Sequence, residues 1–214
     1  HLSVDGKSFV IDTGPDFRQQ MLREDIRQLD AVIFTHEHKD HTAGLDDVRA
    51  YNYLQTTDMP VYGQLDLLEH LKVEFSYAFK DTKYPGIPRL QLCEISESPF
   101  EVQGVEFIPL PVLHMKMPVL GFRIGDFSYI TDANSIPDTT LKKLEGTKVL
   151  VLNALQREKH ISHFNLEEAV AMAASIGAEK TYFTHISHKL GTHKQVENEL
   201  KGSALAYDGL QLTL

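Results

Sequence analysis

The sequence predicts a layered α/β domain with sheets inside and helices outside. Short apolar runs that stop at turn residues indicate strands, and stretches with helical periodicity follow some of these runs. Strands followed by helices, twice along the chain, are typical of α/β layers. At 214 residues the chain has the length of one domain or of two tightly fused half-domains. A chain of this size can bury a stable core without disulfides.

The first half of the chain is expected to alternate strands and helices. A strand over residues 9–11 ends at the turn signal Asp12-Thr-Gly-Pro, and a buried strand over residues 31–34 ends at Thr35-His36. Helices are predicted over residues 44–55 and 64–80. The second of these repeats apolar side chains on one face, namely Leu65, Leu68, Leu71, Phe75 and Phe79.

The second half is expected to be rich in strands. Gly125-Asp126 is predicted as a hairpin turn. Asn165 and Glu168 have the spacing of a capping box at a helix start, and Gly177 is expected to end that helix. The expected strands are residues 90–92, 100–102, 105–110, 121–124, 127–131, 149–152 and 181–183.

The charge balance limits the class of partner. The chain has 21 basic and 30 acidic residues, a net charge of −9. An acidic protein does not suit passive capture of a polyanion such as tRNA or DNA, because neutralisation of phosphates dominates that affinity. A small phosphorylated substrate held by metal ions remains compatible with this charge.

Cysteine use and hydropathy indicate the compartment. Cys93 is the single cysteine, so no internal disulfide can form, which suits a reducing cytoplasm. No apolar run approaches the roughly 18 residues of a bilayer span, so no membrane is expected. The sequence starts at His1 already heading into a strand, and we expect an earlier strand to be missing from it.

The densest chemical signal follows the strand at residues 31–34. Within six positions the chain places His36, His38, Asp40 and His41. His36 and His38 are two residues apart, so in extended chain they point the same way, while Asp40 and His41 can turn toward a second centre. Imidazole and carboxylate are ligands that zinc prefers. A solvated polar loop is the alternative, which so many ligand types in one loop disfavour.

Three further candidates stand alone, each after an apolar run: His114, Asp132 and His185. Singly, each is more often a hydrogen-bonded structural residue than a ligand. Together they complete the ligand count, because the four residues of the histidine loop cannot close two metal sites by themselves.

These residues, in this order, resemble the metallo-β-lactamase superfamily over essentially the whole chain. The resemblance implies a single domain over residues 1–214, an αββα sandwich of two central mixed sheets flanked by helices. It also implies two divalent metal ions, with zinc expected and manganese or iron as alternatives. The implied ligands are His36, His38 and His114 for one ion, Asp40, His41 and His185 for the other, and Asp132 as the bridge.

Later segments are similar to the phosphodiesterase branch of that superfamily. They are His160-Ile-Ser-His163-Phe-Asn, Thr184-His-Ile-Ser-His188-Lys-Leu-Gly and Ala206-Tyr-Asp-Gly-Leu210. The branch includes the phosphoribosyl 1,2-cyclic phosphate phosphodiesterases and, more distantly, the tRNA 3′-processing endonucleases. It implies that His163 lies at the substrate phosphate as a proton donor or charge stabiliser. A helix-flanking role is the alternative for His163, and for His160 the two interpretations are evenly balanced.

Other residues match the superfamily less closely. Asp12 is similar to an early buried aspartate that supports the histidine loop, with a turn aspartate as the alternative. Arg18 is a candidate phosphate contact, although a surface arginine is the better interpretation. His188 either belongs to a structural zinc site with cysteines encoded upstream or is a plain structural residue. Asn153 stands where an aspartate is expected, which leaves one carboxylate role unfilled.

The expected function is a dinuclear metal-dependent hydrolase, a phosphodiesterase acting on a small cyclic or nucleotide-like phosphodiester. A metal-bridging hydroxide would attack phosphorus, Asp40 would orient it, and His163 would assist the departing oxygen. The alternatives are a thioester or lactone hydrolase of the glyoxalase-like branch, and a non-catalytic metal- or nucleic-acid-binding module. The expected partner is a small phosphorylated substrate, nucleic acid is not expected as a large polyanion, and a homodimer stays open.

Overall fold

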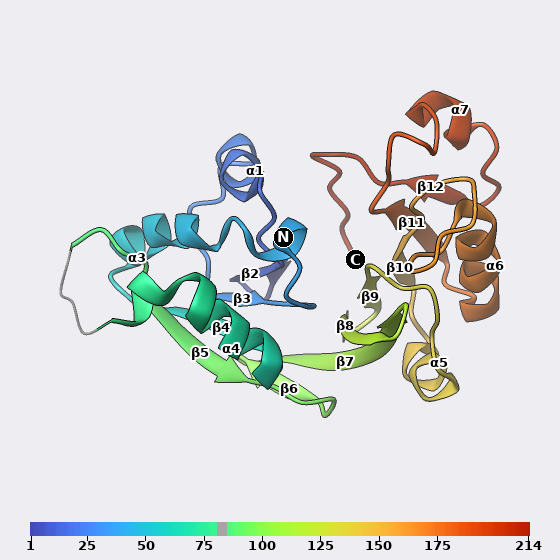
Figure 1. The fold of residues 1–214 in the computed structure, drawn as a ribbon. Helices are drawn as coiled ribbons and strands as arrows, with labels where there is room; N and C mark the ends of the chain where they lie inside the picture. The colour runs from blue at the N-terminus through green and yellow to red at the C-terminus, as the bar shows by residue number, and fades with distance from the viewer. Residues whose placement is uncertain (81–84) are drawn as a thin grey trace. The chain divides into compact units, whose positions relative to one another are not determined.

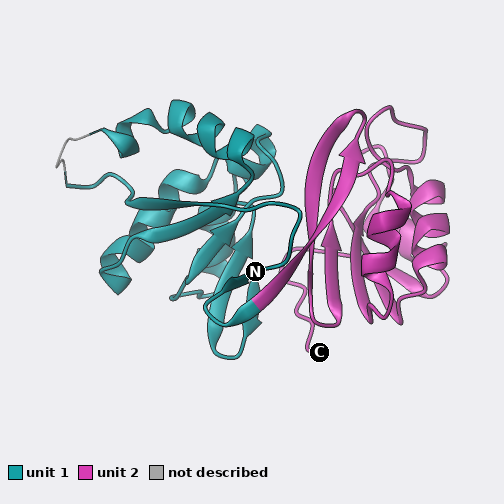
Figure 2. Ribbon diagram, turned by 90° about the horizontal axis from the view of Figure 1, so that it is seen from below, with its two compact units in different colours: residues 1–105 teal, residues 106–214 magenta. Residues whose placement is uncertain are grey.

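The computed structural model describes residues 1–80 and 85–214. Two compact units divide the chain, residues 1–105 and residues 106–214 (Figure 2). Two mixed sheets flanked by helices make up the fold (Figure 1), so the predicted fold class is confirmed. The helices of the described residues are all too short or too polar to cross a lipid bilayer.

The sheet of unit 1 is parallel apart from one edge. Its strand order is β1-β2-β3-β4-β5, and only the β1–β2 pair is antiparallel among these neighbours. Its strands are β1 (Leu2–Val4), β2 (Lys7–Ile11), β3 (Ala31–Ile33), β4 (Met59–Gly63) and β5 (Leu90–Glu94). The helices and the last strand of unit 1 are α1 (Phe17–Arg23), α2 (Lys39–Thr42), η1 (Leu45–Val48), α3 (Arg49–Gln55), α4 (Leu65–Glu74), η2 (Ser76–Phe79) and β6 (Phe100–Val102).

The register of β2 and β3 brings two polar turns to one sheet edge. Ile11 lies opposite Ile33 in the parallel pair, so the segments that follow the two strands leave the sheet side by side. Residues of β3 are buried throughout, which explains its uninterrupted apolar sequence. Asp12 therefore comes out beside the chain that leads to His36.

Unit 2 has a sheet that changes from antiparallel to parallel. In the order β12-β11-β10-β9-β8-β7, the pairs among β7, β8 and β9 are antiparallel and those from β9 to β12 are parallel. The strands are β7 (Val105–His114), β8 (Met117–Ile124), β9 (Phe127–Ile130), β10 (Val149–Asn153), β11 (Lys180–Thr184) and β12 (Ser203–Leu205). The helices are α5 (Asp138–Leu144), α6 (Leu166–Ile176) and α7 (His193–Glu197).

This topology places four strand ends at one edge of the unit 2 sheet. Strands β7, β9, β10 and β11 all run in the same direction, because two successive antiparallel pairings restore the direction of β7 in β9. Residues at or after their carboxyl ends therefore meet at that edge, where open α/β sheets form their sites. His114, Asp132, Asn153 and His185 are the residues in question.

Both predicted helices of unit 1 are interrupted. The helix expected over residues 44–55 is a 3-10 turn, η1, followed by α3. The helix expected over residues 64–80 ends at Glu74, and η2 follows after Phe75. The expected apolar face is also incomplete, because Leu65 at the first helical position is 51% exposed.

Local signals in unit 2 are confirmed. Asn165 accepts a hydrogen bond from the backbone N–H of Glu168, whose side chain accepts from the backbone of Asn165, so the capping box is complete. Gly177 ends α6 in a left-handed conformation with φ 72°. Gly125, with φ 55°, turns the chain between the antiparallel strands β8 and β9.

Candidate metal centre

In unit 1 the histidine loop gathers three imidazoles. The ring centroids of His36 and His38 lie 4.7 Å apart, and those of His36 and His41 lie 4.2 Å apart. His36 and His41 are buried, whereas His38 and Asp40 are exposed. Asp40 stays close to the cluster, with Oδ2 3.4 Å from Nε2 of His41. The loop thus holds the ligand types that the sequence indicated in one place.

A single carboxylate, that of Asp12, organises this loop. Its Oδ1 accepts a hydrogen bond from the backbone N–H of Thr35 at 2.8 Å, and its Oδ2 accepts one from the Thr35 hydroxyl at 2.8 Å. Oδ2 also lies 2.7 Å from Nδ1 of His41. Asp12 has φ 62°, a left-handed conformation that aspartate tolerates better than most residues. These contacts favour the role of Asp12 as a support for the histidine loop over that of a simple turn aspartate.

These contacts fix which nitrogen of each ring carries a proton. A carboxylate can only accept, so His41 donates from Nδ1 to Asp12. The Thr35 hydroxyl gives its proton to Asp12, so its oxygen accepts from Nδ1 of His36 at 2.9 Å. Both rings therefore carry their lone pair on Nε2. This is the tautomer of metal-ligating histidines whose other nitrogen is held by a polar partner.

Glycines let the Asp12 turn touch the histidine loop. The backbone N–H of Thr13 bonds to the carbonyl of His41 at 2.7 Å, and that of Gly44 bonds to the carbonyl of Thr13 at 2.8 Å. A Cβ on Gly14 would lie 2.7 Å from the Asp40 carbonyl oxygen, and one on Gly44 would lie 2.3 Å from the Gly14 carbonyl oxygen. A larger residue at either position would therefore push the Asp12 turn away from the histidine loop.

In unit 2 a second cluster surrounds Asp132. Its Oδ1 lies 2.8 Å from Nε2 of His163 and 3.2 Å from Nε2 of His185. The ring of His163 stacks on that of His185 at 4.9 Å and meets that of His114 edge-on at 4.6 Å. The ligand atoms of His114, Asp132 and His163 all lie within 4.8 Å of one another, a spacing that could hold a metal ion. Asp132 and His163 are buried.

Hydrogen bonds also hold the second carboxylate oxygen of Asp132 and its backbone carbonyl. Thr131 donates its hydroxyl proton to Oδ2 at 2.6 Å. Nδ1 of His114 donates to the Asp132 carbonyl at 2.8 Å, so His114 also carries its lone pair on Nε2. Asp132 has φ 57°, and His185 has φ 54°. Non-glycine residues in this conformation persist where surrounding contacts enforce it, most often at functional sites.

Both clusters fit divalent metal ions by the chemistry of their donors. Buried imidazoles with lone pairs on Nε2, beside carboxylates, are the ligand set that zinc and similar cations prefer. His36, His41 and His114 have on Nδ1 the polar partner that such ligands normally have.

Comparison with known proteins agrees with this chemistry. The sequence pattern of the beta-lactamase superfamily domain matches residues 7–186. The chain is also 38% identical to a diphosphatase from the PhnP family, whose crystal structure it matches with a TM-score of 0.91 over 99% of this chain and 82% of that one. This chain belongs to the metallo-β-lactamase superfamily.

Other similar proteins match different shares of this chain. An octanoyltransferase of Porphyromonas gingivalis is 36% identical over 96% of this chain, which spans only 42% of that protein's length. Ribonuclease Z of Bacillus thuringiensis is 27% identical over 58% of this chain, or 38% of its own length. Human tRNase Z, short form, has the same fold with a TM-score of 0.70 and 17% identity over 98% of this chain and 89% of that one.

Membership of this superfamily supports the predicted class of metal-dependent hydrolase. Divalent metal ions follow from the fold together with the His/Asp clusters.

Asn153 is explained by its backbone partner. Its Oδ1 accepts from the N–H of Ala133 at 2.8 Å, while its Nδ2 donates to the carbonyl of the same residue at 2.9 Å. A carboxylate could make the first bond but could not donate the second. Asn153 therefore holds the backbone directly after Asp132. The sequence alone suggested only that a carboxylate is missing at position 153.

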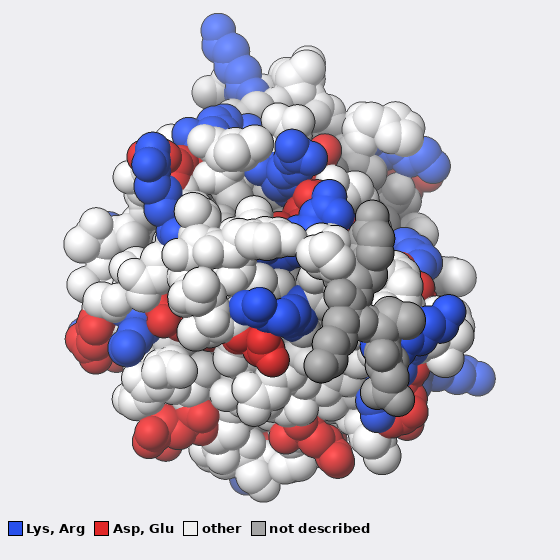
Figure 3. All heavy atoms as spheres, turned by 90° about the vertical axis from the view of Figure 1, so that its left-hand side faces the viewer, with Lys and Arg blue, Asp and Glu red and all other residues white. Residues whose placement is uncertain are grey.

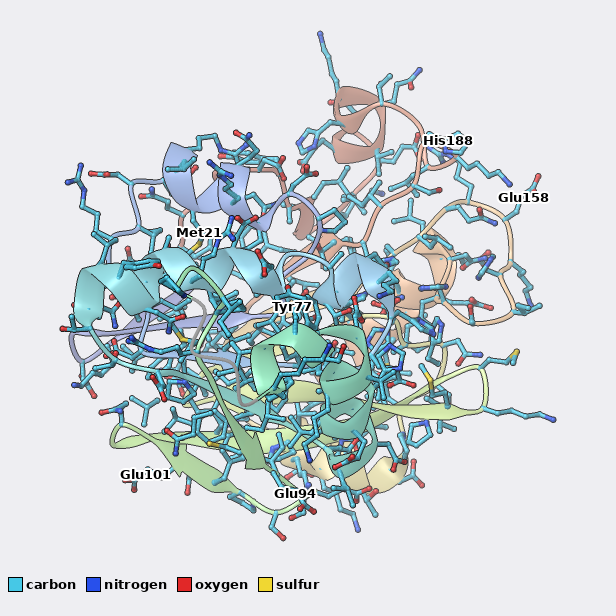
Figure 4. The ribbon with its side chains drawn as sticks, turned by 60° about the vertical axis from the view of Figure 1, so that its left-hand side comes forward. Met21, Tyr77, Glu94, Glu101, Glu158 and His188 are labelled. Atoms are coloured by element: carbon cyan, nitrogen blue, oxygen red, sulfur yellow. The ribbon has the colours of Figure 1, made fainter. Side chains whose placement is uncertain are left out.

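Two sequence candidates lie apart from the clusters. Arg18 in α1 is exposed, and its guanidinium lies 3.9 Å from the carboxylate of Asp47. This position favours a surface arginine over a phosphate contact. His188 is exposed on the segment after β11 (Figure 4). The N–H of Ser187, next to His188, bonds to the carbonyl of Leu155 at 2.9 Å. The segment of His188 therefore lies against the segment that contains Leu155 and Glu158. Within the described part of the chain, neither candidate belongs to a metal-spaced group.

Sequence reasoning missed the small polar residues that orient the ligands. Thr35 and Thr131 each precede a candidate ligand in the chain, and Ser162 precedes His163. A hydroxyl residue directly before a candidate ligand is the signal that could have found them. Ser162 Oγ lies 3.0 Å from Nδ1 of His163 and 3.3 Å from Nδ1 of His160. Loss of surrounding water lowers the pKa of His160, and the charges of His163 and Lys189 lower it further.

Proposed function

We propose that this hydrolase is a phosphodiesterase that cleaves a small cyclic or nucleotide-like phosphodiester. The observation that carries the proposal is His163, a buried imidazole whose Nε2 lies 2.8 Å from Asp132 while His114 and His185 pack against its ring. Such an imidazole suits transfer of a proton to a departing oxygen. The similarity to a protein described as a diphosphatase supports phosphate chemistry.

The metal ligands are proposed as the resemblance divides them, within a single domain of residues 1–214. Two divalent ions, when bound, would supply an activated water and neutralise charge on the phosphoryl oxygens. We favour zinc, because the donors are imidazole and carboxylate. The ligands would be His36, His38 and His114, then Asp40, His41 and His185, with Asp132 between them.

The residues of the chain then have separate tasks. Asp12 keeps the histidine loop in place through Thr35 and His41. Asp40 would orient the attacking water through its exposed carboxylate. A bond forms between the water oxygen and phosphorus, and the bond between phosphorus and the leaving oxygen breaks. The attacking water loses one proton to solvent, and His163 gives the Nε2 proton to the leaving oxygen. The products are a phosphate monoester and an alcohol, which stay in one molecule when the substrate is cyclic.

Charge supports a small substrate. On the face in Figure 3, lysine and arginine side chains are intermixed with aspartate and glutamate. Unit 1 has the ion pairs Arg89–Asp58 at 2.8 Å and Arg49–Asp46 at 3.5 Å. A polyanion needs a continuous basic stripe, and the net charge of −9 opposes one. The protein would therefore act on a small molecule in a reducing cytoplasm, consistent with a single, half-buried cysteine, Cys93.

Thioester hydrolysis is the second candidate. The octanoyltransferase relative, by its name, performs acyl transfer, although this chain spans 42% of that protein. The same activated water could attack a thioester carbonyl. We favour the phosphodiester because the position of His163 suits an alkoxide leaving group, whereas a thiolate leaves without a proton.

A direct comparison of substrates tests the proposal. The zinc- or manganese-loaded protein would be assayed with bis(p-nitrophenyl) phosphate, a cyclic phosphodiester and octanoyl-coenzyme A. We expect hydrolysis of the phosphodiesters and a much lower rate with the thioester. The His36→Ala variant should lose activity, whereas His193→Ala, in which the lost side chain faces Glu197 on α7, should retain it. A preference for the thioester would contradict the proposal.

Metal stoichiometry tests the proposed ligands separately. Titration of metal-free protein with zinc should give about two ions per chain. His41→Ala in unit 1 and His185→Ala in unit 2 should each reduce that number. If removing either histidine leaves the stoichiometry unchanged, that histidine is not a metal ligand as proposed.

A further inference from the structure

Two exposed apolar side chains lie at the edge of the unit 2 cluster. Met115 directly follows His114 in the turn between β7 and β8, and Ile161 lies two residues before His163. Met115 is 51% exposed and Ile161 is 75% exposed. Single exposed apolar side chains are common on protein surfaces and need no explanation. These two residues differ from scattered surface residues in two ways, a shared hydrogen-bond partner and a strained backbone.

One side-chain amide ties both residues to the candidate centre. Oδ1 of Asn134 accepts a hydrogen bond from the backbone N–H of Met115 at 2.9 Å, and its Nδ2 donates to the carbonyl of Ile161 at 3.0 Å. Asn134 lies two residues after Asp132 along the chain. Its own backbone N–H donates to the carbonyl of Leu113 at 2.9 Å. Met115 and Ile161 therefore belong to backbone segments that are fixed relative to each other and to Asp132.

The backbone of Met115 is strained. Its φ is 59°, in the left-handed region where a Cβ meets a steric penalty that glycine does not have. The turn needs only the backbone N–H of residue 115 for its bond to Asn134, and glycine would supply the same group. The methionine side chain therefore adds strain and an exposed apolar surface to the turn. Backbone strain of this kind persists mostly at functional sites.

The neighbouring residues identify what would cover this apolar surface. The ring of His114 meets that of His163 edge-on at 4.6 Å. The proposed reaction brings the leaving oxygen to His163, so the group attached to that oxygen comes next to the two segments that carry these histidines. The same segments present Met115 and Ile161. The flexible, polarisable thioether of methionine packs against apolar groups of many shapes, aromatic rings included.

We propose that Met115 and Ile161 are specificity-determining residues that bind an apolar leaving group of the substrate. This inference rests on the proposed phosphodiesterase function and selects a substrate class within it. The class is a phosphodiester whose leaving alcohol carries an apolar group, such as a nucleobase, in preference to a bare sugar phosphate. Removal of about 55 Å² of apolar surface from water would favour such a substrate about tenfold.

Binding of two phosphonates tests the inference. Zinc-loaded protein would be titrated by calorimetry with phenylphosphonate and with methylphosphonate, which share the anionic group and differ in the apolar group. We expect the phenyl compound to bind about tenfold more tightly. In the double variant Met115→Gly with Ile161→Ser, this ratio should fall toward one while the affinity for methylphosphonate is kept. Both substitutions keep the backbone groups that bond to Asn134.

Three results of the titration would overturn the inference. They are equal affinities for the two phosphonates in the unaltered protein, absence of phenylphosphonate binding, and an unchanged ratio in the double variant.

Two further variants separate ligand binding from folding. Val170→Ser removes another branched apolar side chain of unit 2, which is 39% exposed on α6, and should keep the ratio of affinities. Met115→Gly alone should lower the ratio, yet it should be at least as stable to urea as the unaltered protein, because glycine relieves the left-handed conformation. A Met115→Gly variant that is less stable and keeps the ratio would show that this side chain serves the fold instead.

A kinetic measurement distinguishes this inference from the proposed function. The phosphonates are not hydrolysed, so their binding does not depend on turnover. The expected phosphonate results without hydrolysis of bis(p-nitrophenyl) phosphate would refute the function and leave the apolar site standing. With hydrolysis, KM for that ester should rise about tenfold in the double variant while kcat changes little. An unchanged KM would refute the role of Met115 and Ile161 alone.

Discussion

The two clusters reach similar chemistry by different routes. In unit 1 the four candidate ligands lie within six positions of one loop after β3, and one carboxylate that follows the neighbouring strand, that of Asp12, holds this loop. In unit 2 they come from three separate segments, and the turn after β9 is held through its backbone by His114 and Asn153. The first cluster depends on one local anchor, whereas the second depends on strand register. Substitutions should therefore affect the two units differently.

The largest effect is expected for Asp12→Ala. It would leave the backbone and hydroxyl of Thr35 and Nδ1 of His41 without their common acceptor in a buried site. Each lost partner of a buried donor typically costs 1–3 kcal/mol, so we expect the free energy of unfolding to fall by about 3 kcal/mol or more. Urea unfolding measures this change, and zinc affinity should fall with it.

Two variants control for that experiment. Asp16→Ala removes an exposed aspartate that caps no helix N–H and should change stability little. Asp12→Asn keeps one acceptor oxygen and should fall between Asp12→Ala and the unaltered protein. A stable Asp12→Ala variant with unchanged zinc affinity would show that the histidine loop does not depend on this one anchor.

A smaller effect is expected for Asn153→Asp in unit 2. The new carboxylate would keep the bond from the Ala133 N–H but would face the Ala133 carbonyl without a proton to donate. We expect a loss of about 1–3 kcal/mol in thermal or urea unfolding at neutral pH. Asn134→Asp, at a less buried asparagine with similar bonds to Met115 and Ile161, should cost less. Equal losses of unfolding free energy in the two variants would mean that the backbone after Asp132 does not depend on Asn153 in particular.

The smallest effect is expected at a helix cap. Asn165→Ala removes the side-chain acceptor at the start of α6 and should cost about 1 kcal/mol. Gln64→Ala at the start of α4 in unit 1 should change stability very little, because Gln64 makes no side-chain cap bond. Circular dichroism melting curves of the two variants give this comparison, and activity should be unchanged in both. A larger loss for Gln64→Ala would reverse the expected order.

Much of unit 1 could be predicted because its signals are local. The apolar run of β3 and the ligands that follow it lie within one short segment, and Asp12 ends the neighbouring strand. The close approach of Gly14 and Gly44 could not be predicted in the same way, because only the folded sheet brings the two segments together. The division of the predicted helix into η1 and α3 likewise leaves no local signal in the sequence.

In unit 2 the sequence indicated the residues but not how they are held. His114, Asp132 and His185 follow strands, and the common direction of those strands explains why they meet. The paired amide of Asn153 could not be foreseen, because Ala133 lies 20 positions away along the chain. The role of Ser162 also requires knowledge of where two imidazole rings point. Hydrogen-bond partners that are distant in sequence leave no periodic signal.

Removal and return of metal tests the central claim most directly. Protein treated with a chelator would be assayed with bis(p-nitrophenyl) phosphate before and after zinc or manganese is restored, and its metal content would be measured at each stage by elemental analysis. We predict that activity is lost with the metal and returns with it, and that His36→Ala and His114→Ala, one from each unit, bind less metal and do not recover. Full activity in metal-free protein, or unchanged metal content in both variants, would contradict the account.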